Sequence, residues 1–158
     1  MRRRVILIIG ISILAIPIFL ICNFMNPKPG QTSGNGNPAI LLLGIIFIMF
    51  CCLVYLWTKV FSDYTIKTGV LLVGITVTFI HLVMSIFYQR IAFLRYKNIL
   101  AEKYKVDFGF IDGQYIDSIT SFMSIHVNKQ YFNVNTYFIF LTASIFLSLL
   151  LDYFRKSL

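Results

Sequence analysis

Charged residues are scarce in this chain of 158 residues. Asp, Glu, Lys and Arg make up 13% of it, whereas soluble domains average about 25%, and hydrophobic residues make up 58%. A soluble fold of this size would have too few polar side chains to cover its surface. The charges also lie almost wholly between long uncharged runs, a pattern that excludes a soluble core and indicates a membrane protein.

Motifs for common enzyme chemistry are also missing. The sequence has no HExxH, no GxSxG, no glycine loop that could cradle phosphate and no acidic pair within an apolar run. Asp107, Asp112 and Asp117 recur every five residues, but a calcium loop needs closer alternate ligands and a closing Glu. We therefore expect no catalytic residue, no metal site and no cofactor.

Cysteine offers no redox or metal motif either. Cys22, Cys51 and Cys52 lie in or beside apolar segments and form no CxxC. We interpret them as small packing residues. The net charge of +8 could suggest nucleic acid, but Lys and Arg flank the apolar runs, where they hold helix ends at anionic headgroups. We expect the lipid bilayer, and no nucleic acid, as the partner of these charges.

Four apolar runs are long enough to cross a membrane, which takes about 20 residues in a helix. They predict an all-α integral membrane protein, a four-transmembrane-helix bundle with one extramembrane segment of about 40 residues between helices 3 and 4. The predicted spans are residues 5–22, 39–57, 69–88 and 131–151. Between and after them we expect loops at 23–38 and 58–68, the extramembrane segment at 89–130 and a C-terminal tail at 152–158.

The first span could instead be a signal peptide, because three arginines precede it. No small-x-small cleavage site follows it, so we interpret it as a retained anchor, which Pro17 is expected to kink. The next loop is a cluster of turn formers without apolar residues. It ends in Asn37 and Pro38, which are typical of an N-cap and a first helical position.

Residues 89–130 are the one substantial segment outside the predicted spans. Arg90 to Tyr104 continues at helical spacing, which predicts a short helix that either extends the third span or lies along the lipid headgroups. Asp112-Gly113 then marks a turn. Residues 104–127 could form a hairpin about this turn, but the second arm alternates poorly, and Ile116 and Ile119 favour a helix after the turn. This aromatic segment of mixed charge is our first choice for contact with a partner.

An even number of spans places both termini on one side. If that side is cytoplasmic, each side carries 7 of the Lys and Arg residues. The first helix decides the tie, because three arginines precede it and one lysine follows it. We expect cytoplasmic termini in a bacterial plasma membrane, since the Ile-, Phe-, Lys- and Asn-rich composition is typical of AT-rich bacterial genes.

A polar stripe stands out inside the third span: Gly74, Thr78, His81 and Ser85 follow spacings of four, three and four. Small and hydroxylated residues at such spacing let helices approach one another, so we expect this stripe to point inward. We expect the same of two further lines, Ser144, Ser148 and Asp152 in the fourth span and Gly44, Ile48 and Cys51 in the second.

His81 allows two interpretations. An ionisable group within a span indicates function by default, but no Asp, Glu, Lys or Arg lies in the central part of any span to pair with it. A neutral histidine bonded to a serine or threonine would satisfy its polar atoms equally well. The structural interpretation is therefore favoured.

The functional hypotheses follow mostly by elimination. The first is a non-catalytic multi-pass protein of accessory, regulatory or immunity type, which acts by contact with another membrane protein or with itself. The alternative is a subunit of a small oligomeric transporter or pore that uses the polar stripe.

Overall fold

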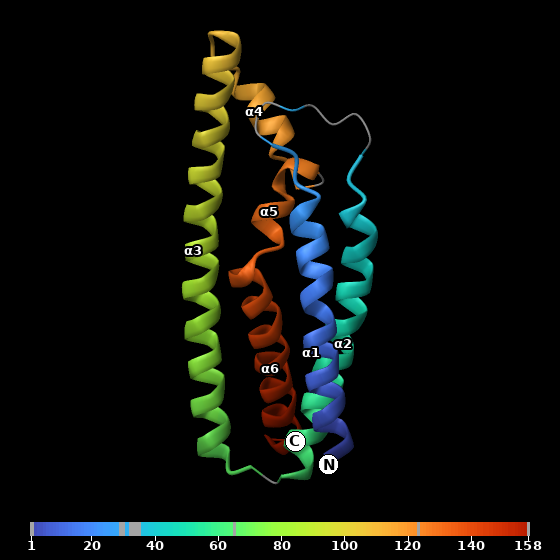
Figure 1. The fold of residues 1–158 in the computed structure, drawn as a ribbon. Coiled ribbons are helices and arrows are strands. Elements are labelled where there is room, and N and C mark those ends of the chain that lie inside the picture. Colours follow the sequence, from blue (N-terminus) through green and yellow to red (C-terminus); the bar gives the residue numbers. More distant parts are fainter. Residues whose placement is uncertain (1, 29–30, 32–35, 65, 123, 158) are drawn as a thin grey trace.

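The chain forms a long bundle of helices in the computed structural model, which describes residues 2–28, 31, 36–64, 66–122 and 124–157 (Figure 1). No strand occurs in these ranges. Four helices are long and apolar enough to cross a membrane, so the predicted all-helical fold with four such helices is confirmed. The helical elements are, in order, α1 (Arg2–Phe24), α2 (Ala39–Asp63), α3 (Thr68–Phe108), α4 (Gly113–Ile119), the 3₁₀ turn η1 (Ile125–Val127), α5 (Asn128–Tyr131) and α6 (Val134–Ser157).

Helix α2 begins beside the asparagine that the sequence indicated. The Oδ1 atom of Asn37 accepts a hydrogen bond from the backbone N–H of Ala39 at 3.1 Å. Pro38, expected at the first helical position, occupies the cap position instead, and the helix begins at Ala39, the first residue of the predicted span. Of the predicted loop at 23–38, residues 29–30 and 32–35 lie outside the described ranges.

Helix α3 is a single helix of 41 residues. Residues 75–108 contain neither glycine nor proline, so no residue type that commonly breaks a helix interrupts it. It ends at Gly109, whose φ of 82° lies in the left-handed region and whose N–H bonds the carbonyl of Lys105 at 2.8 Å. Of the two alternatives predicted for Arg90 to Tyr104, the structure has the helix that extends the third span.

The helix favoured after the Asp112-Gly113 turn is also present, as α4. The Oδ1 atom of Asp112 caps it by accepting the backbone N–H of Tyr115 at 3.0 Å. The helix then packs back on α3, and Leu100, Tyr104 and Ile116 form a small core between the two.

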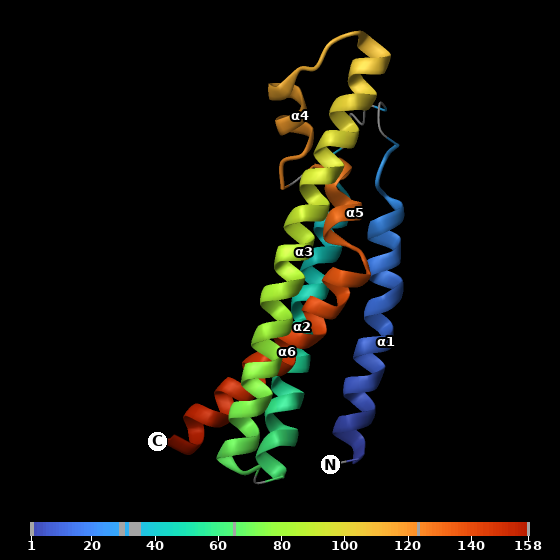
Figure 2. The ribbon, with the colours of Figure 1, turned by 90° about the vertical axis from the view of Figure 1, so that its left-hand side faces the viewer.

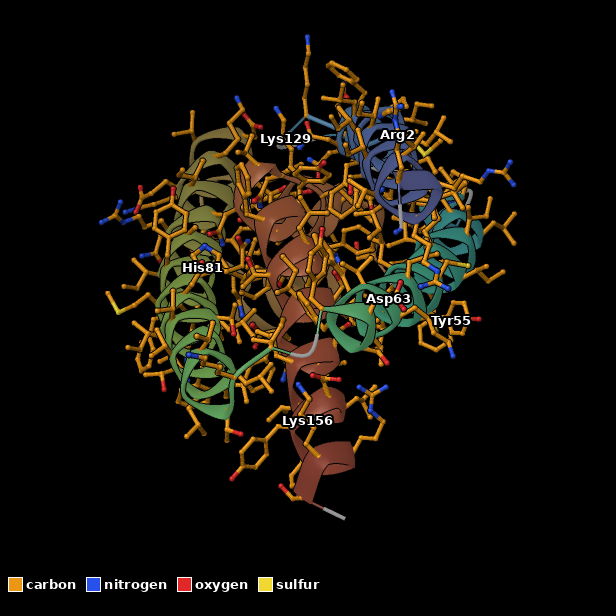
Figure 3. The ribbon with its side chains drawn as sticks, turned by 90° about the horizontal axis from the view of Figure 1, so that it is seen from below. Arg2, Tyr55, Asp63, His81, Lys129 and Lys156 are labelled. Carbon is orange, nitrogen blue, oxygen red and sulfur yellow. The ribbon has the colours of Figure 1, made fainter. Side chains whose placement is uncertain are left out.

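Both termini lie at one end of the bundle, which we call the terminal end, whereas α4 lies at the opposite, distal end (Figure 1). Helix α6 packs against α2 and α3, and α1 packs mainly against α2. Figure 3 shows α6 in the middle of this arrangement, with α1 and α3 on different sides of it. In Figure 2, α3 rises past the other long helices toward α4.

Buried positions recur every seven residues along α1 and α2. They are Ile8, Ala15 and Cys22 in α1, and Ala39, Ile46, Leu53 and Val60 in α2. A seven-residue repeat keeps one seam of each helix turned toward its neighbour, as in left-handed bundles. The other faces carry exposed apolar side chains, for example Leu14 in α1 and Phe47 in α2.

The face predicted to point inward from the second span does not do so. Gly44, Ile48 and Cys51 are exposed, because the buried seam of α2 runs through Ile46 and Leu53 instead. Nearly every residue of this helix is apolar, so hydropathy could not distinguish its faces.

Charged residues join the helices at the terminal end. Arg4 of α1 pairs with Asp63 of α2. Asp152 of α6 is fully buried and pairs with Arg155 and, at 2.8 Å, with Lys156. Lys156 also donates to the carbonyl of Ile66 at 2.8 Å, so α6 is tied to the connection between α2 and α3.

Candidate functional site

Most of the predicted polar stripe lies against α6. Ser85 is buried, and Gly74 and Thr78 are half-buried. A Cβ atom at Gly74 would lie 3.1 Å from the Cδ1 atom of Leu149, so this glycine permits the close approach of α3 and α6. Thr78 donates to the carbonyl of Gly74 at 2.8 Å, which satisfies its hydroxyl within its own helix.

His81 departs from the predicted inward face, because its side chain is exposed. Leu82 is half-buried and takes the inward position between Thr78 and Ser85. The Nε2 atom of His81 and the Oγ atom of Ser85 form a hydrogen bond of 3.3 Å along the helix surface. The structure therefore brings Gly74, Thr78 and Ser85 to one face of α3, whereas His81 is exposed beside it.

The line of polar residues predicted for the fourth span is buried as expected. Ser144, Ser148 and Asp152 have no exposed surface. The hydroxyl of Ser148 lies 2.9 Å from the carbonyl of Val54 in α2 and 2.6 Å from that of Ser144, so it can bond within α6 or across to α2. The hydroxyls of both serines thus bond to backbone carbonyls, of α6 or of α2.

Side-chain amides gather at the distal end, where the sequence analysis missed a network. Asn37 and Asn128 exchange two hydrogen bonds, of 2.8 and 3.0 Å, which join the start of α2 to α5. Gln89 of α3 donates to the carbonyl of Gln130 and accepts from Asn135 at 3.1 Å. We call these residues the carboxamide cluster. The sequence shows that these residues lie near the ends of the predicted spans. It does not show which of them pair, because that depends on the fold.

The cluster holds η1 and α5 inside the distal end. Val127 is fully buried, Asn128 is 1% exposed and His126 is 4% exposed. The hydroxyl of Tyr96 donates to the carbonyl of His126 at 2.7 Å, whereas the Nδ1 atom of His126 is buried without a partner among the described residues. Burial lowers the pKa of His126 below its usual value of 6.5.

The last turns of α3 and helix α4 form a projecting arm, which we define as residues 89–119. Its charged side chains are partly paired, Lys97 with Asp117 and Lys103 with Asp107. Its end exposes apolar side chains that α4 leaves uncovered. We call these residues the tip: Val106, Phe108, Phe110 and Ile111, which are 78%, 59%, 65% and 47% exposed.

Comparison of the chain with protein-family models, with curated proteins and with solved structures gives no match. Within the described residues, no group of three His, Cys, Asp or Glu side chains is placed to hold a metal ion. The arm with its exposed apolar tip is the candidate functional site of the described part of the chain.

Proposed function

We propose that the protein is a non-catalytic, multi-pass membrane protein that binds another protein through the tip of its arm. An accessory, regulatory or immunity-type role would use such contact. The observation that carries this proposal is the exposed apolar tip, whose four side chains are each about half exposed or more. Apolar surface that is open to water favours association, because burial against a partner removes it from water.

The length of α3 supports a position of the tip outside the lipid. A helix of 41 residues is about 60 Å long at 1.5 Å per residue, and the hydrocarbon core is about 30 Å thick. If α3 enters the membrane near Thr68, it leaves near Tyr88, and the following residues project into water. The small core of α3 and α4 then stabilises the arm there.

We expect the partner of the exposed apolar tip to be a protein and not the lipid bilayer. The tip lies about 20 residues beyond Tyr88 along α3, which is about 30 Å at the helical rise. Because the ion pairs of the arm already compensate Lys97 and Lys103, we expect an aromatic and apolar contact surface on the partner. With cytoplasmic termini in a bacterial plasma membrane, the arm would meet this partner at the outer surface.

The test is photocrosslinking from the tip in cells. A photoreactive amino acid at Phe110 is expected to give one discrete adduct with a second protein. The same probe at Ile99, which is 59% exposed on the arm but away from the tip, is the control. Phe108→Ser should reduce the adduct at position 110 several-fold, and Ile99→Ser should leave it unchanged. Equal labelling from both positions, or none from Phe110, would contradict the proposal.

The alternative function, a transporter or pore subunit, makes a different prediction. In the polar stripe, the hydroxyl of Thr78 already bonds a carbonyl of its own helix. A solute would therefore have to contact His81, which lies on the outer surface of the chain. In that case His81→Ala would abolish solute flux into proteoliposomes while Phe110→Ser would not. Under the proposal made here, His81→Ala leaves the photocrosslink intact.

A further inference from the structure

An apolar groove opens between α1 and the beginning of α6. It encloses about 410 Å³. Ile16, Phe19 and Leu20 line it from α1, and Phe132, Tyr137 and Phe138 line it from the other side. Phe19 forms the floor, since it is 8% exposed, whereas Leu20 and Phe138 at the rims are about half exposed.

The aromatic floor of the groove is rigidly held. The ring of Phe19 packs edge-on against Phe132 and Tyr137, with ring centroids 5.8 and 5.5 Å apart. The hydroxyl of Tyr137 donates to the carbonyl of Ser12 at 3.0 Å, so the polar end of this side chain is satisfied within the protein. The surface left for a ligand is almost wholly apolar.

The position of the groove along α1 matches one leaflet of a bilayer. The apolar run 5–22 contains 18 residues and measures about 27 Å in a helix, close to the thickness of the hydrocarbon core. Ile16 to Asn23 therefore occupies the half of the core that is nearer the distal end. The groove therefore lies at the depth of the acyl chains of that leaflet.

A basic residue, Lys129, lies next to Asn133 at the distal part of the groove lining. Lys129 is exposed and comes four residues before Asn133, which also lines the groove. Its backbone is fixed on both sides: its N–H donates to Oδ1 of Asn26 at 3.1 Å, and its carbonyl accepts from Asn133 at 3.2 Å. Figure 3 shows Lys129 on the side of the bundle between α1 and α3.

The carboxylate of Asp117 in α4 already pairs with Lys97 of α3. The sequence has no Asp or Glu from 64 to 101 or from 118 to 151. Within the described part of the chain, Lys129 and Arg90 form no ion pair with a carboxylate. The apolar groove thus lies at the depth of the lipid acyl chains. Lys129, which pairs with no carboxylate of the described residues, lies beyond it at the depth of the headgroups.

We propose that this groove binds an anionic phospholipid, with one acyl chain along Phe19 and the headgroup phosphate at Lys129. The apolar walls suit the hydrocarbon chain, and the lysine supplies the counter-charge that an anionic headgroup needs. A zwitterionic lipid offers the same chain but no net negative charge. This site is independent of the tip, and its test leaves the proposed protein contact untouched.

The experiment measures lipid binding to the purified full-length protein by native mass spectrometry, with phosphatidylglycerol and phosphatidylcholine of identical chains. We expect phosphatidylglycerol to bind the wild type more tightly. Lys129→Gln should weaken its binding about fivefold, which corresponds to about 1 kcal/mol for one basic residue at an anionic surface. Lys105→Gln, a control at an exposed lysine near the end of α3, should change nothing.

A second pair of variants tests the acyl-chain half of the site. Leu20→Trp fills the groove and should weaken both lipids, whereas Leu14→Trp, at an exposed position of α1 that does not line it, should weaken neither. Circular dichroism and gel filtration confirm that each variant is folded. Equal affinity of the wild type for both lipids, equal effects of the two lysine variants, or equal effects of the two tryptophan variants would overturn the proposal.

Discussion

Single polar side chains inside the long helices bond mostly to backbone carbonyls. Thr78 donates to Gly74, and Ser148 lies 2.9 Å from the Val54 carbonyl of the neighbouring helix. In a lipid surrounding such groups cannot bond to water, so a bond within the protein is the one way to satisfy them. At the scale of residues, the polar groups of the spans therefore stabilise the fold, and the carboxamide cluster does the same at the distal end.

The reciprocal pair of Asn37 and Asn128 gives the first prediction. Asn128 is 1% exposed. Asn128→Leu therefore leaves the amide of Asn37 without this partner at a site that water does not reach. We expect a loss of about 1–3 kcal/mol in the free energy of unfolding, the cost of an unsatisfied buried polar group. Thermal unfolding in mild detergent measures it. Asn98→Leu, at an exposed position of α3, is the control, and an equal loss in both variants would contradict the assigned role.

His126 gives the second prediction, a dependence of stability on pH. Its pKa in the folded protein lies below 6.5, because burial disfavours the charged ring. The unfolded chain therefore binds more protons than the folded chain as the pH falls below about 6.5, and stability is lost in that direction. The melting temperature of the wild type should fall between pH 7.5 and 5.5 more than that of His126→Phe. Parallel curves for the two proteins would exclude His126 as the cause.

At the scale of elements, the sequence predicted the helices better than their contacts. The four apolar runs and the absence of Gly and Pro from 75 to 108 indicate the long helices directly. The inward faces were harder to predict. In α6, Ser144 and Ser148 distinguish one face and were placed correctly, whereas Gly44 in the uniformly apolar α2 is exposed. A hydropathy pattern marks a face only where polar residues interrupt it.

The same limit applies to the candidate site. Gly74, Thr78 and Ser85 lie toward α6 as expected, but Leu82 replaces His81 at the interface because the contact follows a seven-residue repeat. The burial of η1 and α5 could not be predicted at all. It depends on hydrogen bonds between residues far apart in the chain, such as the bond from Asn37 to Asn128.

The contact between α3 and α6 gives the third prediction. Gly74→Val introduces a Cβ atom 3.1 Å from Leu149, a buried side chain with little room to move. Overpacking of this kind costs about 1–3 kcal/mol, so the melting temperature should fall. Gly44→Val, at a helical glycine with nothing within 4 Å of the added atom, should have little effect. A larger loss at Gly44 would show that the faces of these helices are assigned wrongly.

At the scale of the whole molecule, the two ends differ. The terminal end is closed by ion pairs that join α1 to α2 and that compensate the buried Asp152. The distal end carries the carboxamide cluster, the groove and the arm with its exposed tip. If the four long apolar helices each cross the membrane, these two ends lie on opposite sides of it, as the functions proposed for the distal end require.

Cysteine accessibility tests this topology most directly. Single cysteines replace Ser157 and Phe110 in turn, in a chain whose Cys22, Cys51 and Cys52 are changed to alanine, and intact cells are treated with a membrane-impermeant maleimide. With cytoplasmic termini, position 110 should label in intact cells and position 157 only after permeabilisation. Labelling of both positions from the same side would contradict four crossings with the arm opposite the termini.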